Sequence, residues 1–299
     1  MSEKKYRVLN STSLGYLLYD FEDSSISVHP NRKKITYQGE KIVIGDFVTL
    51  DDKSVISSVV KRTNHLERPR LANCDIAFVL VSLREPDFSS YLLDKFLSFL
   101  DYHDIPAGII LSKADLLKKR ELTSFQKRME FYRKEGYPVY FIDAHDSTRF
   151  DYGLLRNDIH GKSIAFVGQT GVGKSSLINL ICPDFRRKVD SLFVTSGRGR
   201  HTTKEIVLLP YQDGFIFDTP GFSELELRDM KSLDLAYCFP GYGRYLNRCM
   251  FKDCLHLPSS KGCAVYEDVD KKELSMDSYE NYLRILEEVK ENDRWKKKL

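Results

Sequence analysis

The clearest chemical signal in the sequence is a loop with the pattern Gly-x-x-x-x-Gly-Lys-Ser at residues 168–175. The apolar run 164–167 before it predicts a buried strand, and residues 176–181 after it predict a helix. Backbone N–H groups of such a loop surround phosphate oxygens, and the helix N-terminus adds positive partial charge. Lys174 is able to reach the β- and γ-phosphates of a nucleotide, and Ser175 is able to ligate Mg²⁺. Strand, spacing and helix agree, so we predict a phosphate-binding loop rather than a chance glycine-rich turn.

Two further motifs each end a predicted strand, at residues 112–115 (Ser-Lys-Ala-Asp) and 217–221 (Phe-Asp-Thr-Pro-Gly). Ligands of parallel sheets bind at the carboxyl ends of the strands. Asp115 is placed to accept hydrogen bonds from N1–H and the amino group of guanine, a donor pair that adenine lacks. Asp218 is expected to hold Mg²⁺ through water, and the N–H of Gly221 to sense the γ-phosphate.

A basic segment, Ser-Gly-Arg-Gly-Arg-His-Thr-Thr at residues 196–203, lies between the phosphate-binding loop and the 217–221 motif. On its own it is typical of a disordered surface insertion. In this position we interpret it as a switch that responds to the nucleotide. Thr203, rather than Thr202, is the residue expected to complete the Mg²⁺ shell when GTP is bound.

Hydrolysis needs a group that orients the attacking water, and in Ras-like GTPases a Gln follows the Asp-x-x-Gly motif. Phe222 occupies that position here and cannot hydrogen-bond water. Slow intrinsic hydrolysis is therefore expected. His201 is the candidate for positioning the water, and the alternative is that it contacts RNA or anchors the loop.

Cys249, Cys254, His256 and Cys263 offer three thiolates and one imidazole within a short segment. This set is sufficient for tetrahedral Zn²⁺. The segment has few apolar residues to fold it otherwise, so a metal would supply the missing folding energy. The alternative is free cysteines beside a surface histidine.

The composition is that of a folded chain of more than one domain, with 299 residues, 42% of them hydrophobic, and a net charge of +3. So small a charge does not by itself indicate a nucleic-acid partner. No apolar run approaches the ~20 residues of a membrane span, and the N-terminus lacks a signal-peptide core. We therefore expect a cytoplasmic protein without a membrane partner, whose cysteines are reduced. Local basic clusters occur at Lys61-Arg62, Arg68 and Arg70, Arg186-Arg187-Lys188, Arg198 and Arg200, and Lys296-Lys297-Lys298.

The order of predicted elements indicates three parts. Short β-like runs at residues 6–9, 15–19, 25–28, 34–37, 41–50 and 55–60 suggest a five-stranded barrel such as the OB-fold. Such a barrel either binds RNA or only packs on its neighbour. Strands then alternate with helices, which predicts a mostly parallel α/β sheet. Tyr279, Tyr282, Leu283, Leu286 and Val289 mark an amphipathic helix near the C-terminus.

The guanine-reading motif precedes the phosphate-binding loop, and this order resembles the circularly permuted GTPases. Among them the chain is similar to the ribosome small-subunit-dependent GTPase family. The similarity covers the base motif, the phosphate-binding loop, Gly-Arg-Gly-Arg-His-Thr-Thr, Asp-Thr-Pro-Gly-Phe and the C-terminal metal motif, in that family's order. Residues 66–75 also resemble its linker between barrel and GTPase domain.

The resemblance implies a multidomain α/β protein: an OB-fold-like barrel (1–66), a circularly permuted P-loop GTPase domain (67–230) and a zinc-binding helical domain (231–299). It implies hydrolysis of GTP to GDP and phosphate with Mg²⁺ by a monomer, stimulated by the small ribosomal subunit during its late maturation. Barrel and zinc domain would bind ribosomal RNA. His201, Lys174 and Thr203 are the expected catalytic residues, and Ser175 and Thr203 the expected Mg²⁺ ligands. The expected nucleotide-binding residues are Ser112, Lys113, Ala114, Asp115, Asp143, Ala144, Gly168, Gln169, Thr170, Gly171, Val172, Gly173, Lys174, Ser175, Ser176, Thr202, Thr203, Asp218 and Gly221.

The chain departs from the family pattern at three places. The base motif usually begins with Asn, which ties it to the phosphate-binding loop and contacts the purine; Ser112 should weaken nucleotide affinity more than guanine preference. The base-backing loop usually reads Ser-Ala, and here it is Asp143-Ala144, whose Ala144 N–H is still able to contact guanine O6. The last zinc-ligand gap, 257–262, is one residue longer than usual and lacks Glu-Pro.

Two other functions stay open on sequence alone. One is an RNA-binding protein in which nucleotide is structural and turnover incidental. The other is an ATP-using P-loop enzyme, either a kinase or an ATPase. Asp115 argues against the second, and Ser112 is the residue that keeps it open.

Overall fold

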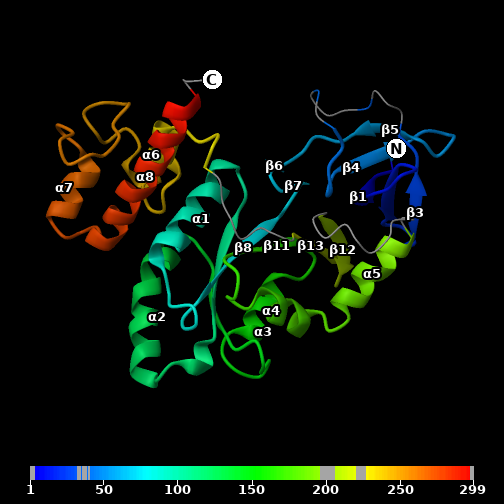
Figure 1. Cartoon of the computed structure of the whole chain (residues 1–299), viewed down its shortest axis with the longest axis horizontal. Coiled ribbons are helices and arrows are strands. Elements are labelled where there is room, and N and C mark those ends of the chain that lie inside the picture. Colours follow the sequence, from blue (N-terminus) through cyan, green and yellow to red (C-terminus); the bar gives the residue numbers. More distant parts are fainter. Residues whose placement is uncertain are drawn as a thin grey trace.

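A computed structural model describes residues 4–31, 35, 39, 41–195, 206–219 and 227–296. The chain forms three parts in sequence order: a small β-barrel, a central sheet covered by helices, and a helical C-terminal part. The barrel and the C-terminal helices lie at opposite ends of the central sheet (Figure 1). The three-part α/β architecture expected from the sequence is confirmed.

The N-terminal sheet is antiparallel, with the strand order β3-β2-β1-β4-β5. A backbone bridge between Asn31 and Ile56 joins its two outer strands, so the sheet closes on itself as an OB-like barrel. Its core is formed by buried aliphatic side chains such as Val8, Leu9, Leu17, Leu18 and Val48. The strands are β1 (Tyr6–Ser11), β2 (Tyr16–Asp20), β3 (Ile26–His29), β4 (Phe47–Leu50) and β5 (Ile56–Val59).

The predicted strand 41–50 is shorter in the structure, because β4 begins only at Phe47. Gly45 has φ +91°, and the carboxylate of Asp46 accepts a hydrogen bond from the N–H of Val43 at 2.8 Å, so the chain turns before the strand. Arg62 binds both oxygens of the buried Asp46, at 2.8 and 2.9 Å. The predicted strand 34–37 falls largely outside the described residues.

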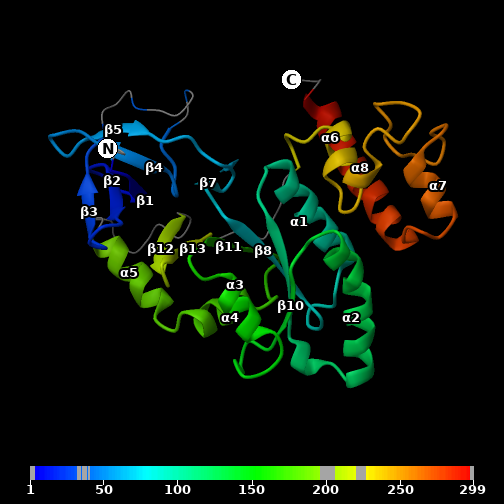
Figure 2. The ribbon, with the colours of Figure 1, turned by 180° about the vertical axis from the view of Figure 1, so that it is seen from behind.

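A six-stranded sheet forms the central part, with the order β10-β9-β8-β11-β13-β12. All neighbouring strands run parallel except the hairpin β12–β13. Seen from behind, the labels β12, β13, β11 and β8 follow one another across the sheet (Figure 2). The strands are β8 (Ile76–Ser82), β9 (Ala107–Ser112), β10 (Val139–Ile142), β11 (Ser163–Val167), β12 (Val207–Tyr211) and β13 (Gly214–Asp218).

The strand order shows the permutation directly. The chain enters this sheet at β8, in its interior, and the strand that carries the phosphate-binding loop, β11, comes three strands later yet pairs with β8. The accompanying helices are α1 (Ser90–Tyr102), η1 (Ala114–Leu116), α2 (Lys119–Lys134), α3 (Tyr152–Asp158), α4 (Lys174–Ile181) and α5 (Phe185–Thr195). Helix α1 begins directly after Ser89, whose side chain accepts a hydrogen bond from the N–H of Leu92.

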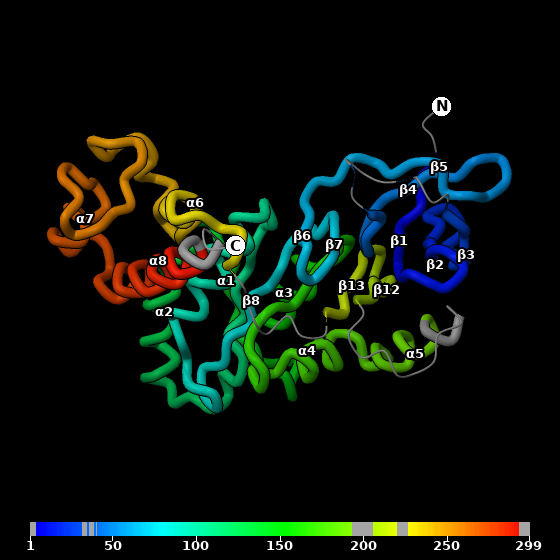
Figure 3. The backbone as a smooth tube through the Cα atoms, turned by 45° about the horizontal axis from the view of Figure 1, so that its top comes forward, coloured from blue at the N-terminus to red at the C-terminus, as the bar shows by residue number. Residues whose placement is uncertain are grey.

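A buried arginine, Arg7, joins the barrel to the central sheet. Arg7 on β1 is 2% exposed, and its guanidinium donates to the carbonyl of Asn73 at 2.7 Å and to the hydroxyl of Ser163 at 3.2 Å. It also lies 4.2 Å from the ring centre of Phe47. The short hairpin of β6 (His65–Glu67) and β7 (Arg70–Ala72) connects the two parts (Figure 3).

The C-terminal part consists of α6 (Ser232–Cys238), η2 (Gly243–Tyr245), α7 (Ala264–Asp270) and α8 (Met276–Lys296), and it packs on α1 through α6 and α8. The fully buried carboxylate of Asp94 on α1 accepts hydrogen bonds from Tyr132 on α2 at 2.6 Å and from Asn281 on α8 at 2.7 Å. Arg244 pairs with Glu135 at 2.9 Å. Within the part of the chain that the structure describes, no helix is both long and apolar enough to span a bilayer.

Candidate nucleotide and zinc sites

The predicted nucleotide-binding segments meet at one edge of the central sheet. Parallel strands place their carboxyl ends together, and β9, β11 and β13 end at Ser112, Val167 and Asp218. The register pairs Ala165 with Phe217, so Asp218 lies beside the start of the phosphate-binding loop. The base motif and the phosphate-binding loop are therefore brought to one edge although more than fifty residues separate them.

The phosphate-binding loop requires its glycines. Gly168 has φ +146°, and a Cβ there would lie 2.2 Å from the carbonyl oxygen of Leu80. Gly171 and Gly173 have φ +83° and +95°, in the left-handed region that glycine tolerates at no steric cost. Helix α4 begins directly after them at Lys174. A backbone of this shape ending in a helix N-terminus matches the chemistry of phosphate oxygens, so the residues present fit a nucleotide.

Lys174 folds back over this loop. Its ammonium donates to the carbonyls of Gly168 and Gln169, the latter at 2.7 Å. Burial lowers the pKa of Lys174 to about 8. The two carbonyls compensate the Lys174 ammonium only partly for the water that it has lost. Lys174 is therefore suited to bind a phosphate, because negatively charged phosphate oxygens would be stronger partners than the carbonyls.

The base motif is joined to the phosphate-binding loop by Ser112. Its hydroxyl donates to the carbonyl of Val172 at 2.6 Å and lies 3.3 Å from the carbonyl of Val81. The side chain is buried, and the next residue, Lys113, has the left-handed φ of +58°. The contact that we expected to be lost with the family's Asn is therefore made by the serine hydroxyl.

The base-backing loop follows β10, whose Ile142 pairs with Ser112. Ala144 thus lies next to the base motif. The carboxylate of Asp143 accepts hydrogen bonds from the N–H of His145 at 2.9 Å and from Arg149 at 3.1 Å. Arg149 did not stand out in the sequence, because a single arginine seven residues beyond a strand carries no motif.

The Mg²⁺ side of the site is described only in part. Ser175 is exposed in the first turn of α4, and Asp218 ends β13. Burial raises the pKa of Asp218, and Arg186 opposes this shift. Oxygen donors of this kind fit Mg²⁺, which keeps several waters in its shell. His201, Thr202, Thr203, Gly221 and Phe222 lie outside the described residues.

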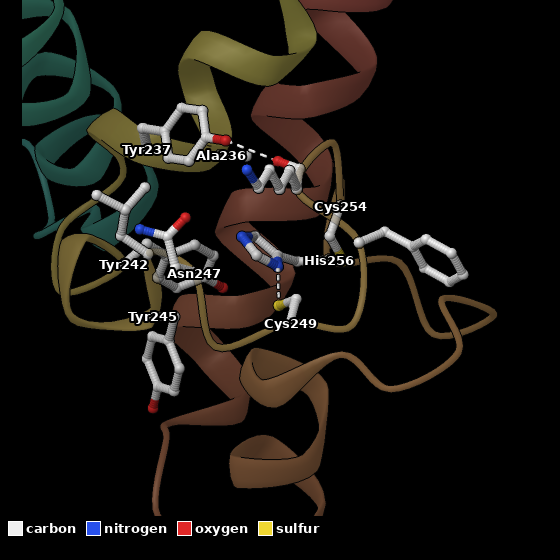
Figure 4. A pocket seen from close by; sticks show the side chains of 11 residues that line it. Ala236, Tyr237, Tyr242, Tyr245, Asn247, Cys249, Cys254 and His256 are labelled. Atoms are coloured by element: carbon white, nitrogen blue, oxygen red, sulfur yellow. Dashed lines mark hydrogen bonds between the residues drawn. The ribbon is translucent and has the colours of Figure 1, made fainter.

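The four predicted zinc ligands converge in the C-terminal part, and Figure 4 shows three of them, Cys249, Cys254 and His256. Their ligand atoms all lie within 4.8 Å of one another. The Nδ1 atom of His256 is 3.6 Å from Sγ of Cys249 and 3.5 Å from Sγ of Cys263. Zn–S and Zn–N bonds of about 2.3 and 2.0 Å in a tetrahedron would separate these atoms by about 3.5 Å, so the donor set fits zinc.

The surrounding residues hold the zinc-ligand loop in place. The other ring nitrogen of His256 has the backbone of Ala236 as hydrogen-bond partner, an arrangement that commonly orients a metal-binding imidazole. From α8, the hydroxyls of Tyr279 and Tyr282 donate to the carbonyls of His256 and Leu255 at 2.7 and 2.8 Å. The amphipathic helix predicted from these tyrosines therefore both packs the domain and supports the loop.

Comparison with known proteins agrees with this arrangement. The model of the RsgA GTPase family matches residues 59–228. The "Small ribosomal subunit biogenesis GTPase RsgA" of Shouchella clausii is 37% identical over 84% of this chain and 86% of its own, and that of Bacillus subtilis is 33% identical over 95% and 97%.

Two solved structures share the whole fold. The crystal structure of YloQ, described as a circularly permuted GTPase, is 30% identical, with a TM-score of 0.78 over 96% of this chain and 95% of that one. YjeQ from Thermotoga maritima is also 30% identical, with a TM-score of 0.80 over 96% and 98%. Family model, identity and coverage together identify the chain as a member of the RsgA GTPase family, a circularly permuted GTP hydrolase.

Proposed function

We propose that this GTPase acts in late maturation of the small ribosomal subunit, and that binding to the subunit's RNA stimulates its hydrolysis of GTP. The observation that supports the proposal is the extent of the alignment between this chain and its relatives. A relative named for small-subunit biogenesis aligns with 95% of the chain, so barrel and C-terminal part are shared as well as the GTPase domain. A role specific to the GTPase domain alone would not require the other two parts.

Guanine recognition is assigned to the loops after β9 and β10. Asp115 accepts from N1–H and the 2-amino group of the base, and Ala144 donates its backbone N–H to O6. Ser112 acts indirectly, since its hydroxyl holds the base motif against Val172 of the phosphate-binding loop. Lys113 and Ala114 also line the proposed guanine site.

Phosphate binding is assigned to residues 168–176, whose backbone N–H groups and Lys174 neutralise the β- and γ-phosphates. Ser175 and Thr203 are the proposed Mg²⁺ ligands, with Asp218 acting through water. A Mg²⁺ ion held by these residues would supply positive charge against the charge that develops during phosphoryl transfer. Thr202 and Gly221 complete the contacts to the γ-phosphate side.

In the free protein, the slow step of the proposed reaction is activation of the attacking water. Phe222 offers no hydrogen bond to water, so His201 is proposed to position the nucleophile once the switch is ordered. The small subunit would supply that ordering, which makes turnover conditional on binding. GTP then favours the tightly bound state and GDP the released one.

Zinc is proposed as a structural ion held by Cys249, Cys254, His256 and Cys263. All four coordination positions are filled by protein, which is typical of structural rather than catalytic sites. The metal would fix the loop between α6 and α7, and with it one of the two parts proposed to bind ribosomal RNA. The barrel, at the other end of the sheet, is the second (Figure 3). We further propose that the protein is a cytoplasmic monomer.

The proposal is tested by sedimentation with purified small subunits. With a non-hydrolysable GTP analogue the protein should sediment with small subunits, and with GDP most of it should remain free. Large subunits serve as the control. Binding that is equal in both nucleotide states would favour an RNA-binding protein with a structural nucleotide, and competition by ATP as effective as by GTP would favour an ATP-using enzyme.

A further inference from the structure

The base-backing loop contains an ion pair beside the proposed guanine site. Strand β10 ends at Ile142, which pairs with Ser112, so Asp143 and Ala144 follow directly alongside the base motif. The loop is compact, since its Asp146 carboxylate accepts hydrogen bonds from both the N–H and the hydroxyl of Thr148, at 2.8 and 2.6 Å. Ala144, whose N–H is assigned to guanine O6, is the residue directly after Asp143 in this loop.

Asp143 is a charged residue at a place with little solvent. Its side chain is 5% exposed, and one carboxylate oxygen accepts from the backbone N–H of His145. The other oxygen lies 3.1 Å from the guanidinium of Arg149, which is half exposed and also contacts the Phe150 ring. Removing one partner of such a pair leaves a nearly buried charge without its counter-ion, which costs more than the pair itself contributes.

The charge matters because of what the adjacent residue is proposed to bind. Guanine O6 is electronegative, and a carboxylate without a counter-ion next to Ala144 would repel it. We propose that Arg149 is a positioning residue for guanine recognition: it neutralises Asp143 beside the base-backing loop, leaving the Ala144 N–H to donate to O6. The inference rests on the proposed guanine site and adds to it a residue that does not itself touch the nucleotide.

A purely structural role would have a different signature. If Arg149 only stabilised the loop, its removal would weaken every nucleotide equally. If it acts through O6, the loss is confined to nucleotides that carry O6. The 2-aminopurine riboside diphosphate keeps the 2-amino group but lacks O6 and N1–H. The lost N1–H contact to Asp115 weakens the analogue equally in wild type and variant, so the change caused by Arg149→Ala still separates the two roles.

The test measures equilibrium binding of GDP and of 2-aminopurine riboside diphosphate to the full chain. Arg149→Ala should weaken GDP about tenfold, equivalent to about 1.4 kcal/mol, and change binding of the analogue less than about twofold. Arg149→Lys, which keeps the charge, should stay close to wild type. The double variant Asp143→Ser with Arg149→Ala should recover GDP binding, because the charge that needed neutralising is gone.

Arg187→Ala is the matched control, because Arg187 is a largely exposed arginine paired on one helical turn with Asp184. GDP binding unchanged in Arg149→Ala, or an equal loss for both nucleotides, would overturn the inference. Failure of the proposed function would look different: the wild-type chain itself would bind GDP no better than ADP.

Discussion

The hydroxyl of Ser112 donates a hydrogen bond to the carbonyl oxygen of Val172 across 2.6 Å, joining the base motif to the phosphate-binding loop. Ser112 is the last residue of strand β9, and Val172 lies in the phosphate-binding loop that follows strand β11. Serine is shorter than the family's asparagine, so it keeps this contact but leaves the purine without an amide partner. Ser112 therefore performs one of the two tasks of the family's asparagine: it joins the two loops but does not contact the purine.

Ser112→Ala should weaken binding of both GDP and inorganic tripolyphosphate about fivefold, because a buried carbonyl loses its donor and the phosphate-binding loop loosens. Competition binding with the two ligands measures this. Ser147→Ala removes an exposed serine hydroxyl nearby and should have no effect. A loss seen for GDP but not for tripolyphosphate would mean that Ser112 acts on the base alone.

Ser112→Asn should tighten GDP binding, since the amide is able to make the same contact and reach the purine as well. Stopped-flow release of a fluorescent GDP analogue should become slower than in the wild type. Faster release would show that the longer side chain does not fit the buried space now filled by serine.

Asp115→Asn should lower the preference for GTP over xanthosine triphosphate. Xanthine carries an oxygen where guanine has its amino group, so an amide side chain pairs with it and a carboxylate repels it. Binding of the two nucleotides to wild type and variant gives the change in selectivity. Selectivity that is the same in both would show that the base motif is assigned to the wrong residues.

Elemental analysis should find one zinc per chain. Cys254→Ser should lose the metal and melt at a lower temperature, because zinc binding is coupled to folding of the loop between α6 and α7. Cys238→Ser is the matched control, since Cys238 lies in the same part of the chain outside the ligand cluster. A metal-free protein with unchanged melting temperature would exclude a structural zinc site.

Asp94, at the junction of α1, α2 and α8, should make stability depend on pH. Burial raises the pKa of Asp94 to about 7 from 3.8, although Tyr132 and Asn281 donate to it. Between these two pH values the folded state binds a proton that the unfolded state has released. Stability therefore falls as pH rises through this window, and the whole loss is reached above about pH 7.

Between pH 6 and pH 8.5 this group should account for a loss on the order of 1 kcal/mol in the free energy of unfolding. Asp94→Asn should remove this loss from the pH profile of the free energy of unfolding measured with urea. The substitution need not leave the stability at any single pH unchanged. Asp52→Asn, at an exposed position, should leave the profile unchanged. An equally steep profile in Asp94→Asn would assign the dependence to another group.

The sequence predicts the parts of this protein that depend on local pattern. Residues 168–175 and their flanking strand and helix follow from glycine placement and periodicity, and the zinc ligands from four donors in a short segment. The joining of Ser112 to Val172 and the pairing of Arg149 with Asp143 were not predicted. Both depend on which strands lie side by side, and neither residue belongs to a motif of its own.

The barrel shows the same limit. Its short strands were recognisable, but the run 41–50 looked like one strand, because the turn made by Gly45 and Asp46 depends on Arg62, a residue sixteen positions away from Asp46. Likewise, the docking of the barrel through the buried Arg7 is invisible in a sequence where Arg7 is one charge among many.

Steady-state GTP hydrolysis with and without purified small ribosomal subunits tests the central claim most directly, with large subunits as control. We predict slow hydrolysis by the protein alone, strong stimulation by small subunits and none by large ones. GTP binding without stimulation by small subunits would contradict the proposed role at the ribosome, while leaving the nucleotide site intact.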